Sequence, residues 1–255
     1  MKYRFSWSNV LIYRLNQGAR FAWLALLLVG VMDRQGAFGL DAWPNYRGPT
    51  DSGRADDAKL PIHWSEEKNV VWKTLIEGKA WSSPVIAGEQ IFLTNAPEDG
   101  SNLSVVCIDK KTGAVRYDKR LHTVPLPQYC HPFNSYASPS PVVENGRLYV
   151  SFGSPYNACL KTATGEVVWE RTDLVCNHFR GPASSPFLYQ DLWIQHFDGS
   201  DRQYVMAFNK ETGATIWRTD RTVDYDDIDP ETGQIERQGD WRKAFSTPIL
   251  SLIHI

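Results

Sequence analysis

Four side chains are candidates for binding a ligand. His131, His178 and Arg180 stand shortly before short apolar segments, and His196 lies at the end of one. An arginine in such a position can pair with a carboxylate or a phosphate. The alternative is that His178 and Arg180 hold their own loop by bonding backbone carbonyls. For His196 the alternative is the end of a hairpin, because Asp198-Gly199 is a turn signal.

The four cysteines form two matched pairs. Cys107 and Cys159 each precede a Thr-Gly turn in the same register, which predicts small buried side chains. Cys130 and Cys176 each lie seven residues before an alanine that leads into an apolar segment. An exported protein allows a disulfide between them, unless their loops are too far apart for the required geometry. A metal site at Cys130, His131, Cys176 and His178 lacks the usual ligand spacing, and we expect no metal.

An acidic stretch at residues 224–233 has the alternate carboxylates of a calcium loop. The glycine of such a loop is expected one place earlier than Gly233. Asp229 to Gly233 also repeats a turn motif found elsewhere in the chain. The stretch therefore predicts a solvated hairpin more than a calcium site.

Repeated segments must position these residues. Three Ser-Pro steps open short apolar strands, a second strand follows each, and a fourth step begins at residue 246. The prolines of the four steps are spaced by 57, 45 and 62 residues. Asn145-Gly146 predicts a type I′ hairpin, because both central residues of that turn need positive φ. The Ser-Pro steps are Ser83-Pro84, Ser140-Pro141 and Ser185-Pro186, and the fourth copy starts at Ser246-Thr247-Pro248.

Each repeat also contains a Thr-Gly turn with an aromatic residue four places beyond the glycine. Asp109 and Asn209 can bond the amides of their own turns, while the glycine adopts the left-handed conformation. The aromatic then lies on the last strand and fills space against a neighbouring sheet. Repeats of this length predict an all-β fold, a β-propeller of four-stranded antiparallel blades. The glycine and aromatic pairs are Gly113 with Tyr117, Gly165 with Trp169 and Gly213 with Trp217.

The run Asp-x-x-Thr-Gly-x-x-x-Trp resembles the repeat of pyrroloquinoline-quinone-type β-propellers. That group includes quinoprotein dehydrogenases and BamB-like assembly factors. The opening Trp43-Pro-Asn-Tyr-Arg-Gly-Pro49 and residues 64–85 resemble the start of exported bacterial members. The resemblance covers residues 43–249 and implies the fold, whereas fold by itself does not define activity.

The sequence favours a noncatalytic function. A quinoprotein dehydrogenase needs calcium ligands, and many members carry two adjacent cysteines over the quinone, a pair that this sequence does not contain. We therefore expect an exported scaffold that binds a protein or small ligand through its loop-rimmed face, as a BamB-like assembly factor does, without a cofactor. The alternative is an oxidoreductase that uses pyrroloquinoline quinone and calcium to oxidise alcohols or sugars.

The N-terminus predicts export to the periplasm or the extracellular space. Basic residues precede the apolar run of residues 21–32, which is short of the roughly 20 residues of a spanning helix. Ala37-Phe38-Gly39 offers a cleavage site, so residues 1–39 are read as a signal peptide and 40–255 as the propeller domain. An uncleaved anchor is the alternative. A net charge of -2 without a basic face argues against nucleic acid as a partner.

The repeats predict a partial ring. Three complete repeats are present, whereas closed propellers usually have 4–8 blades. The segment around Trp72 is expected to be an orphan strand that completes a blade whose other strands lie elsewhere. We therefore expect that the chain is a fragment of a longer protein with seven or eight blades.

Overall fold

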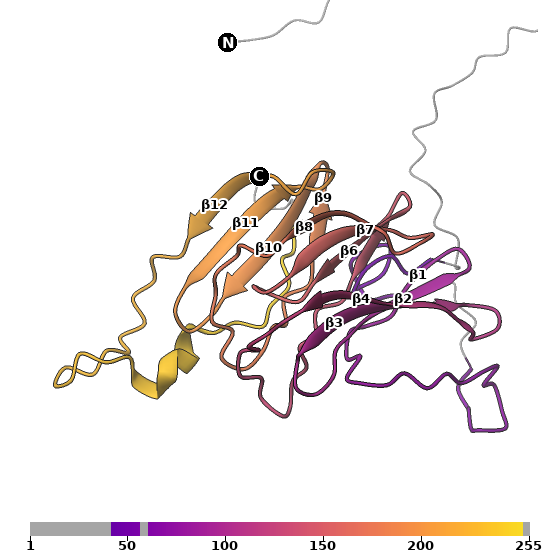
Figure 1. Cartoon of the computed structure of the whole chain (residues 1–255), viewed down its shortest axis with the longest axis horizontal. Helices are drawn as coiled ribbons and strands as arrows, with labels where there is room; N and C mark the ends of the chain where they lie inside the picture. Colours follow the sequence, from indigo (N-terminus) through magenta and orange to yellow (C-terminus); the bar gives the residue numbers. More distant parts are fainter. Residues whose placement is uncertain (1–41, 57–60, 252–255) are drawn as a thin grey trace, which may run out of the picture. The chain divides into compact units, whose positions relative to one another are not determined.

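The computed structural model describes residues 42–56 and 61–251, so the predicted signal peptide lies outside the described residues. Within the described part, twelve strands form three sheets of four antiparallel strands each, and each sheet is a meander (Figure 1). The first sheet contains β1 (Val85–Ala87), β2 (Gln90–Asn95), β3 (Asn102–Asp109) and β4 (Val115–Thr123). The second contains β5 (Val142–Glu144), β6 (Arg147–Ser151), β7 (Asn157–Lys161) and β8 (Val167–Arg171). The third contains β9 (Phe187–Tyr189), β10 (Leu192–Asp198), β11 (Gln203–Asn209) and β12 (Thr215–Asp220).

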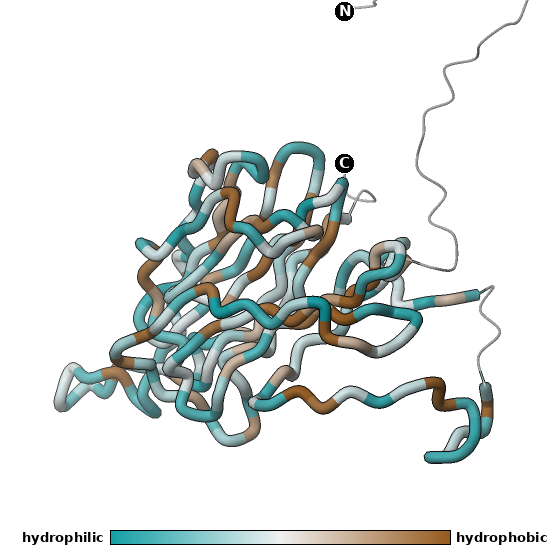
Figure 2. The backbone as a smooth tube through the Cα atoms, turned by 45° about the vertical axis from the view of Figure 1, so that its right-hand side comes forward, coloured by the Kyte–Doolittle hydropathy of each residue, from teal (hydrophilic) through white to brown (hydrophobic). Residues whose placement is uncertain are grey.

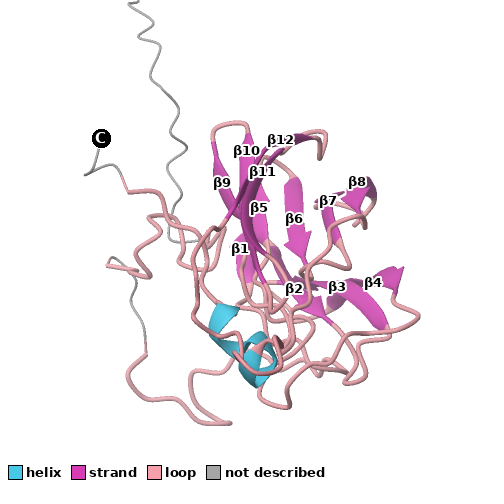
Figure 3. Cartoon of the chain, turned by 90° about the vertical axis from the view of Figure 1, so that its left-hand side faces the viewer, coloured by secondary structure: helices cyan, strands magenta, loops and turns pink. Residues whose placement is uncertain are grey.

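The sheets pack face to face through two shared cores. One core joins the first and second sheets and contains Phe92, Val105 and Leu148. The other joins the second and third sheets and contains Tyr149, Trp193 and further aromatic residues. This arrangement confirms the prediction of β-propeller blades. A short 3-10 helix, Glu236–Arg242, follows the third sheet (Figure 3). No helix in the described ranges is long and apolar enough to cross a membrane.

The turns follow the backbone chemistry that the sequence predicts. Asn145 and Gly146 have φ of 50° and 77°, as a type I′ hairpin requires. At the Thr-Gly turn of the first sheet, the Asp109 carboxylate accepts the N–H groups of Lys111 and Thr112. Gly113 closes that turn with a φ of 75°. Local hydrogen bonds therefore make each of these turns largely independent of the packing around it.

The small residue before each turn lies directly across from the aromatic residue after it. Cys107 pairs with Tyr117, and Cys159 pairs with Trp169. Ala207 occupies the same place opposite the aromatic residue of the third sheet. All three small side chains are fully buried, which confirms their predicted burial. A larger side chain would compete with the aromatic ring for the same space between the sheets.

The aromatic side chains link each sheet to the next. Each ring lies against the turn glycine of the following sheet and donates a hydrogen bond to the second carbonyl of that turn. A β-carbon added to Gly213 would come within 2.5 Å of the Trp169 ring, so the contact requires glycine. The three donor and acceptor pairs are Trp72 Nε1 with Lys110 O at 2.9 Å, Tyr117 Oη with Thr162 O at 2.9 Å, and Trp169 Nε1 with Lys210 O at 2.9 Å.

Trp217 differs from the other aromatics. Its side chain is 38% exposed, and every residue of β12 is exposed. Within the described residues, no further sheet follows β12 and no turn receives this indole. The expectation that the repeat aromatic fills space against a neighbouring sheet is therefore wrong for Trp217, because burial of each ring requires the next sheet.

The segment around Trp72 belongs to none of the three sheets. Residues 70–77 are extended but form no strand ladder. The indole and the Thr74 hydroxyl bind the carbonyls of Lys110 and Gly113 instead. Figure 2 shows this part of the chain as an extended stretch that follows the grey gap at residues 57–60. Trp72 thus docks on the first sheet without a blade of its own among the described residues.

Candidate functional site

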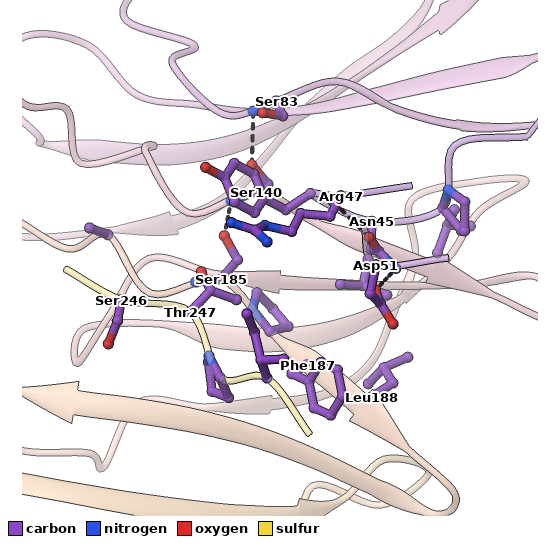
Figure 4. Close-up of a pocket in the computed structure, with 18 of the residues that line it drawn as sticks. Asn45, Arg47, Asp51, Ser83, Ser140, Ser185, Phe187, Leu188, Ser246 and Thr247 are labelled. Carbon is purple, nitrogen blue, oxygen red and sulfur yellow. Dashed lines mark hydrogen bonds between the residues drawn. The ribbon is translucent and has the colours of Figure 1, made fainter. Parts of the chain in front are cut away.

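The Ser-Pro steps line up along the inner edges of the three sheets. The Ser83 N–H donates to Ser140 Oγ at 2.8 Å, and the Ser140 N–H donates to Ser185 Oγ at 2.9 Å. The Ser185 N–H then donates to Thr247 Oγ1 at 3.1 Å (Figure 4). One hydroxyl per repeat therefore ties neighbouring sheets together. Thr247 fits this ladder because threonine also supplies a hydroxyl, and it stands where the next Ser-Pro step begins.

The segment that opens with Trp43 covers the start of this ladder. Trp43 pairs with Ile86 through two backbone hydrogen bonds of 2.9 and 2.8 Å. The next carbonyl, that of Pro44, accepts the N–H of Val143 at 2.8 Å. Gly48 then turns the chain with a φ of 76°, against the face of the Trp43 ring. These contacts place residues 43–53 over the inner edges of the first two sheets.

A pocket of about 610 Å³ opens between this segment, the first strands of the sheets and residues 245–249. Its lining combines hydroxyls of the ladder with apolar side chains such as Phe187. The Arg47 side chain reaches over it toward Ser140 and Ser185 (Figure 4). Within the described residues, the Arg47 guanidinium has no hydrogen-bond or ion-pair partner. An exposed guanidinium beside hydroxyls can bind a carboxylate or phosphate oxygen.

The two carboxylates of the pocket are already paired. Glu144 accepts a hydrogen bond from Lys210 Nζ at 2.6 Å. Asp51 accepts one from the side-chain amide of Asn45 at 2.8 Å. The sequence pattern indicated neither Arg47 nor this pocket as a site. The signal that could have found it is the spacing of the serines together with an arginine in the opening motif.

His178 lies elsewhere and serves its loop. Its side chain is 6% exposed, and its Nε2 accepts the N–H of Ser154 at 2.9 Å. The Nδ1 atom of the ring lies 3.2 Å from Lys243 Nζ and 3.9 Å from Cys176 Sγ. Burial lowers the pKa of His178 to about 3, and burial also lowers the pKa of Lys243 to about 8. The neutral ring holds the loop in place, so the geometry favours the structural alternative for His178.

Arg180 and His131 belong to the same pair of loops. The Arg180 guanidinium binds both carboxylate oxygens of Asp240, at 2.7 and 2.9 Å. Its backbone carbonyl accepts the His131 N–H at 3.4 Å and the Asn134 amide at 2.8 Å. His131 Nδ1 accepts the N–H of Phe133 at 3.1 Å. The structure thus brings His131, His178 and Arg180 together but occupies them with internal contacts.

His196 is separate from that group. It lies on β10, and its Nδ1 is 3.1 Å from the Ser246 hydroxyl and 3.8 Å from Asp198 Oδ2. Burial lowers the pKa of His196 from its usual value. Asp198 is in turn bound by both nitrogens of the Arg221 fork, at 2.8 and 3.0 Å. His196 therefore joins β10 to the segment that follows the helix.

The cysteines form no disulfide in this structure. Cys130 and Cys176 are both free thiols, so the bond allowed by their matched positions is not present. Cys130 Sγ packs against Gly181, whereas Cys176 Sγ packs against Gly199 and His178. The two thiols thus occupy different loop contacts. Burial raises the pKa of Cys176 to about 12, which keeps it a thiol. No group of three or more metal-binding side chains occurs in the described ranges.

The acidic stretch forms the predicted hairpin. Ile228 bridges Ile235, and Asp229 Oδ1 accepts the N–H groups of Glu231 and Thr232. Asp227 differs from the expectation of a solvated stretch, since it is 1% exposed. Both of its carboxylate oxygens bind the Arg242 guanidinium, at 2.6 and 2.8 Å. That ion pair connects the hairpin to the short helix.

A family model described as outer membrane protein assembly factor BamB matches residues 101–235, more than half of the chain. The chain belongs to this family. The matched residues contain the three Thr-Gly turns and the hairpin at 228–235, so the repeat seen in the structure is the part that the family shares. No curated protein matches the chain significantly in sequence.

The chain is also similar to solved structures. A quinohemoprotein alcohol dehydrogenase, ADHIIG from Pseudomonas putida HK5, is 15% identical over 71% of this chain and 27% of its own, with a TM-score of 0.49. BamB from Moraxella catarrhalis is 18% identical over 51% of this chain and 34% of its own, with a TM-score of 0.36. A europium-containing methanol dehydrogenase is 16% identical over 62% and 30%, with a TM-score of 0.42. The chain thus spans about a third or less of the length of these structures.

Proposed function

We propose that this chain belongs to an exported, noncatalytic β-propeller that binds a carboxylate- or phosphate-bearing group of a protein or small ligand. Family membership supports a scaffold of this type. The observation that carries the proposal is the pocket at the inner edges, where the Arg47 guanidinium lies over Ser140 and Ser185 and has no partner in the described part of the chain. A periplasmic or extracellular location is part of the proposal and follows from the apolar run at residues 21–32.

The chemistry of the pocket suits recognition. Arg47 supplies a charge with two parallel donors, the serine ladder supplies hydroxyls, and Phe187 supplies an apolar wall. Backbone hydrogen bonds at Trp43 and Val143 hold the arginine-bearing segment in place. A ligand would therefore meet a preformed site and would pay little for ordering it.

Binding is tested with Arg47→Gln and with Arg54→Gln as the matched control. Arg54 lies in the same segment, does not line the pocket, and pairs with Asp56 at the surface. The probes are inorganic phosphate and an N-acetylated dipeptide with a free carboxylate. Their affinity for each variant is measured by isothermal titration calorimetry. Loss of one charged hydrogen bond should weaken binding by roughly tenfold for Arg47→Gln. Equal affinity for both variants would contradict the role of Arg47.

A separate experiment tests the proposal that the protein is noncatalytic. The protein is supplied with pyrroloquinoline quinone and calcium, and dye reduction is measured with alcohols and sugars. Substrate-dependent turnover above the rate without protein would establish the oxidoreductase alternative. Pull-down from an envelope extract with the wild type and Arg47→Gln then separates a protein partner from a small ligand.

A further inference from the structure

The hairpin at residues 228–235 carries a fourth copy of the turn that receives an aromatic ring elsewhere. Asp229 Oδ1 accepts the N–H groups of Glu231 and Thr232 at 2.8 and 2.9 Å. The Gly233 N–H donates to the Asp229 carbonyl at 2.8 Å. The φ of Gly233 is 67°, close to those of Gly113 and Gly213 at 75° and 72°. The backbone of this turn therefore has the shape of the occupied ones.

The occupied copies define what such a turn binds. An aromatic ring covers the glycine, and its N–H or O–H donates to the carbonyl one residue after the start of the turn. A second donor two residues after the aromatic reaches the glycine carbonyl in two of the copies. Thr74 Oγ1 makes this bond to Gly113, and Arg171 makes it to Gly213 at 2.8 Å. Such a turn therefore recognises three successive residues: an aromatic residue, any residue, and a residue whose side chain donates a hydrogen bond.

The fourth turn is formed, but no side chain of the described residues covers its glycine. A β-carbon added to Gly233 meets no atom within 4 Å, whereas the same addition at Gly113 or Gly213 strikes an indole at 2.5 Å. The acceptor that corresponds to Lys110 O is the carbonyl of Pro230. Residues 230–238 are all exposed, so a ring can reach the turn from outside.

The proline at the second position of this turn explains how the turn can lie outside a sheet. In the three sheets, the second turn residue donates its N–H to the first hairpin of its own blade, as Lys110 does to Glu89 at 3.0 Å. Pro230 has no N–H, so its turn leaves no such donor unsatisfied. The Ile228 to Ile235 bridge and the Asp227 to Arg242 ion pair hold the hairpin instead. Figure 1 shows it projecting from the chain between β12 and the short helix.

The occupant need not be part of a blade. Trp72 docks from an extended segment that pairs with no strand, so an extended peptide is sufficient. The exposed charged residues of 224–238 are mainly acidic, with Arg237 as the basic one. This excess of carboxylates favours a basic residue in the peptide. Trp72-Lys73-Thr74 has the matching order of aromatic, basic residue and donor. The acidic residues beside the turn are Asp224, Asp226, Glu231 and Glu236.

We propose that the 228–235 hairpin is a docking site for an extended segment of a partner protein that carries tryptophan, a basic residue and threonine or arginine in succession. The tryptophan covers Gly233 and donates to the Pro230 carbonyl, and the third residue donates to the Gly233 carbonyl. This site is independent of the pocket under Arg47, so either proposal can fail without the other.

The test uses a labelled synthetic peptide that copies residues 70–76, titrated against the protein by fluorescence anisotropy. Gly233→Asn places a side chain where the ring would lie, while asparagine tolerates positive φ. Gly146→Asn is the matched control, because Gly146 also has positive φ and open space around it. The wild type and Gly146→Asn should bind equally, and Gly233→Asn at least tenfold more weakly. A peptide with alanine in place of its tryptophan should not bind.

Three other results would overturn the proposal. Absence of binding to the wild type, or equal binding to Gly233→Asn, would show that the turn receives no such segment. A second copy of the chain could also occupy the turn, because Trp217-Arg218-Thr219 has the same residue order and is exposed. Sedimentation velocity tests for such self-association. Self-association that disappears in both Gly233→Asn and Trp217→Ala would assign the turn to a second copy and not to another protein.

Discussion

Trp169→Ala and Trp217→Ala should differ in their cost, although the two residues occupy the same place in their repeats. The Trp169 ring contacts the Trp193 ring at a centroid distance of 5.3 Å, covers Gly213 and donates to the Lys210 carbonyl. Removing a large packed aromatic costs about 3–5 kcal/mol. Trp217 is 38% exposed and has no such acceptor among the described residues, so about 1–2 kcal/mol is expected.

The assay is urea denaturation followed by far-ultraviolet circular dichroism, with the free energy of unfolding taken at a common m-value. Trp169→Phe separates the ring from its N–H. It keeps most of the packing and loses one hydrogen bond, so it should cost about 1 kcal/mol beyond any repacking. Equal losses of stability for Trp169→Ala and Trp217→Ala would refute the argument that the next sheet's turn buries each aromatic.

Three further outcomes can be measured on the same protein. Ser140→Ala should lower the free energy of unfolding by about 1–3 kcal/mol, because it leaves a backbone N–H without its acceptor; Thr247→Ser keeps the hydroxyl and should be nearly neutral. The folded-state pKa of His178, about 3, lies below its unfolded value, so the unfolded state binds more protons between these pKa values. Stability should therefore fall as pH drops from about 6.5 toward 3, by up to about 1.4 kcal/mol per pH unit more than in His178→Gln. Native thiol titration should leave Cys176 unreactive until denaturant is added, and mass spectrometry before and after reduction should show no bond from it to Cys130.

Local chemistry explains what the sequence predicted well. Strand starts, the Asn145-Gly146 hairpin and the Thr-Gly turns depend on residues within a few positions of one another. The pairing of Cys159 with Trp169 follows from two strands joined by one short turn. The structure of a blade could therefore be predicted from one repeat, and the recurrence of the repeat indicated the propeller.

The candidate site was predicted far less well. Arg180 looked like a ligand-binding arginine, but Asp240, 60 residues away, occupies its guanidinium. His178 was a candidate for ligand binding with a loop-holding role as the alternative, and its burial against Ser154 and Lys243 keeps the ring neutral. No pattern near these residues reports such partners, because the contacts join separate loops.

The sequence by itself determined the repeat, the turn chemistry and the small residue opposite each aromatic, since all of these are short-range consequences of residue type. Only the tertiary structure decided which polar groups remain without a hydrogen-bond partner. Packing the first strands side by side turned three Ser-Pro steps into one hydroxyl ladder and placed Arg47 above it. Docking of Trp72 filled the turn at Gly113 and Trp169 filled the turn at Gly213, whereas no described residue covers the turn at Gly233. Whether a donor is satisfied depends on atoms distant in the chain, and only folding brings those atoms within hydrogen-bond distance.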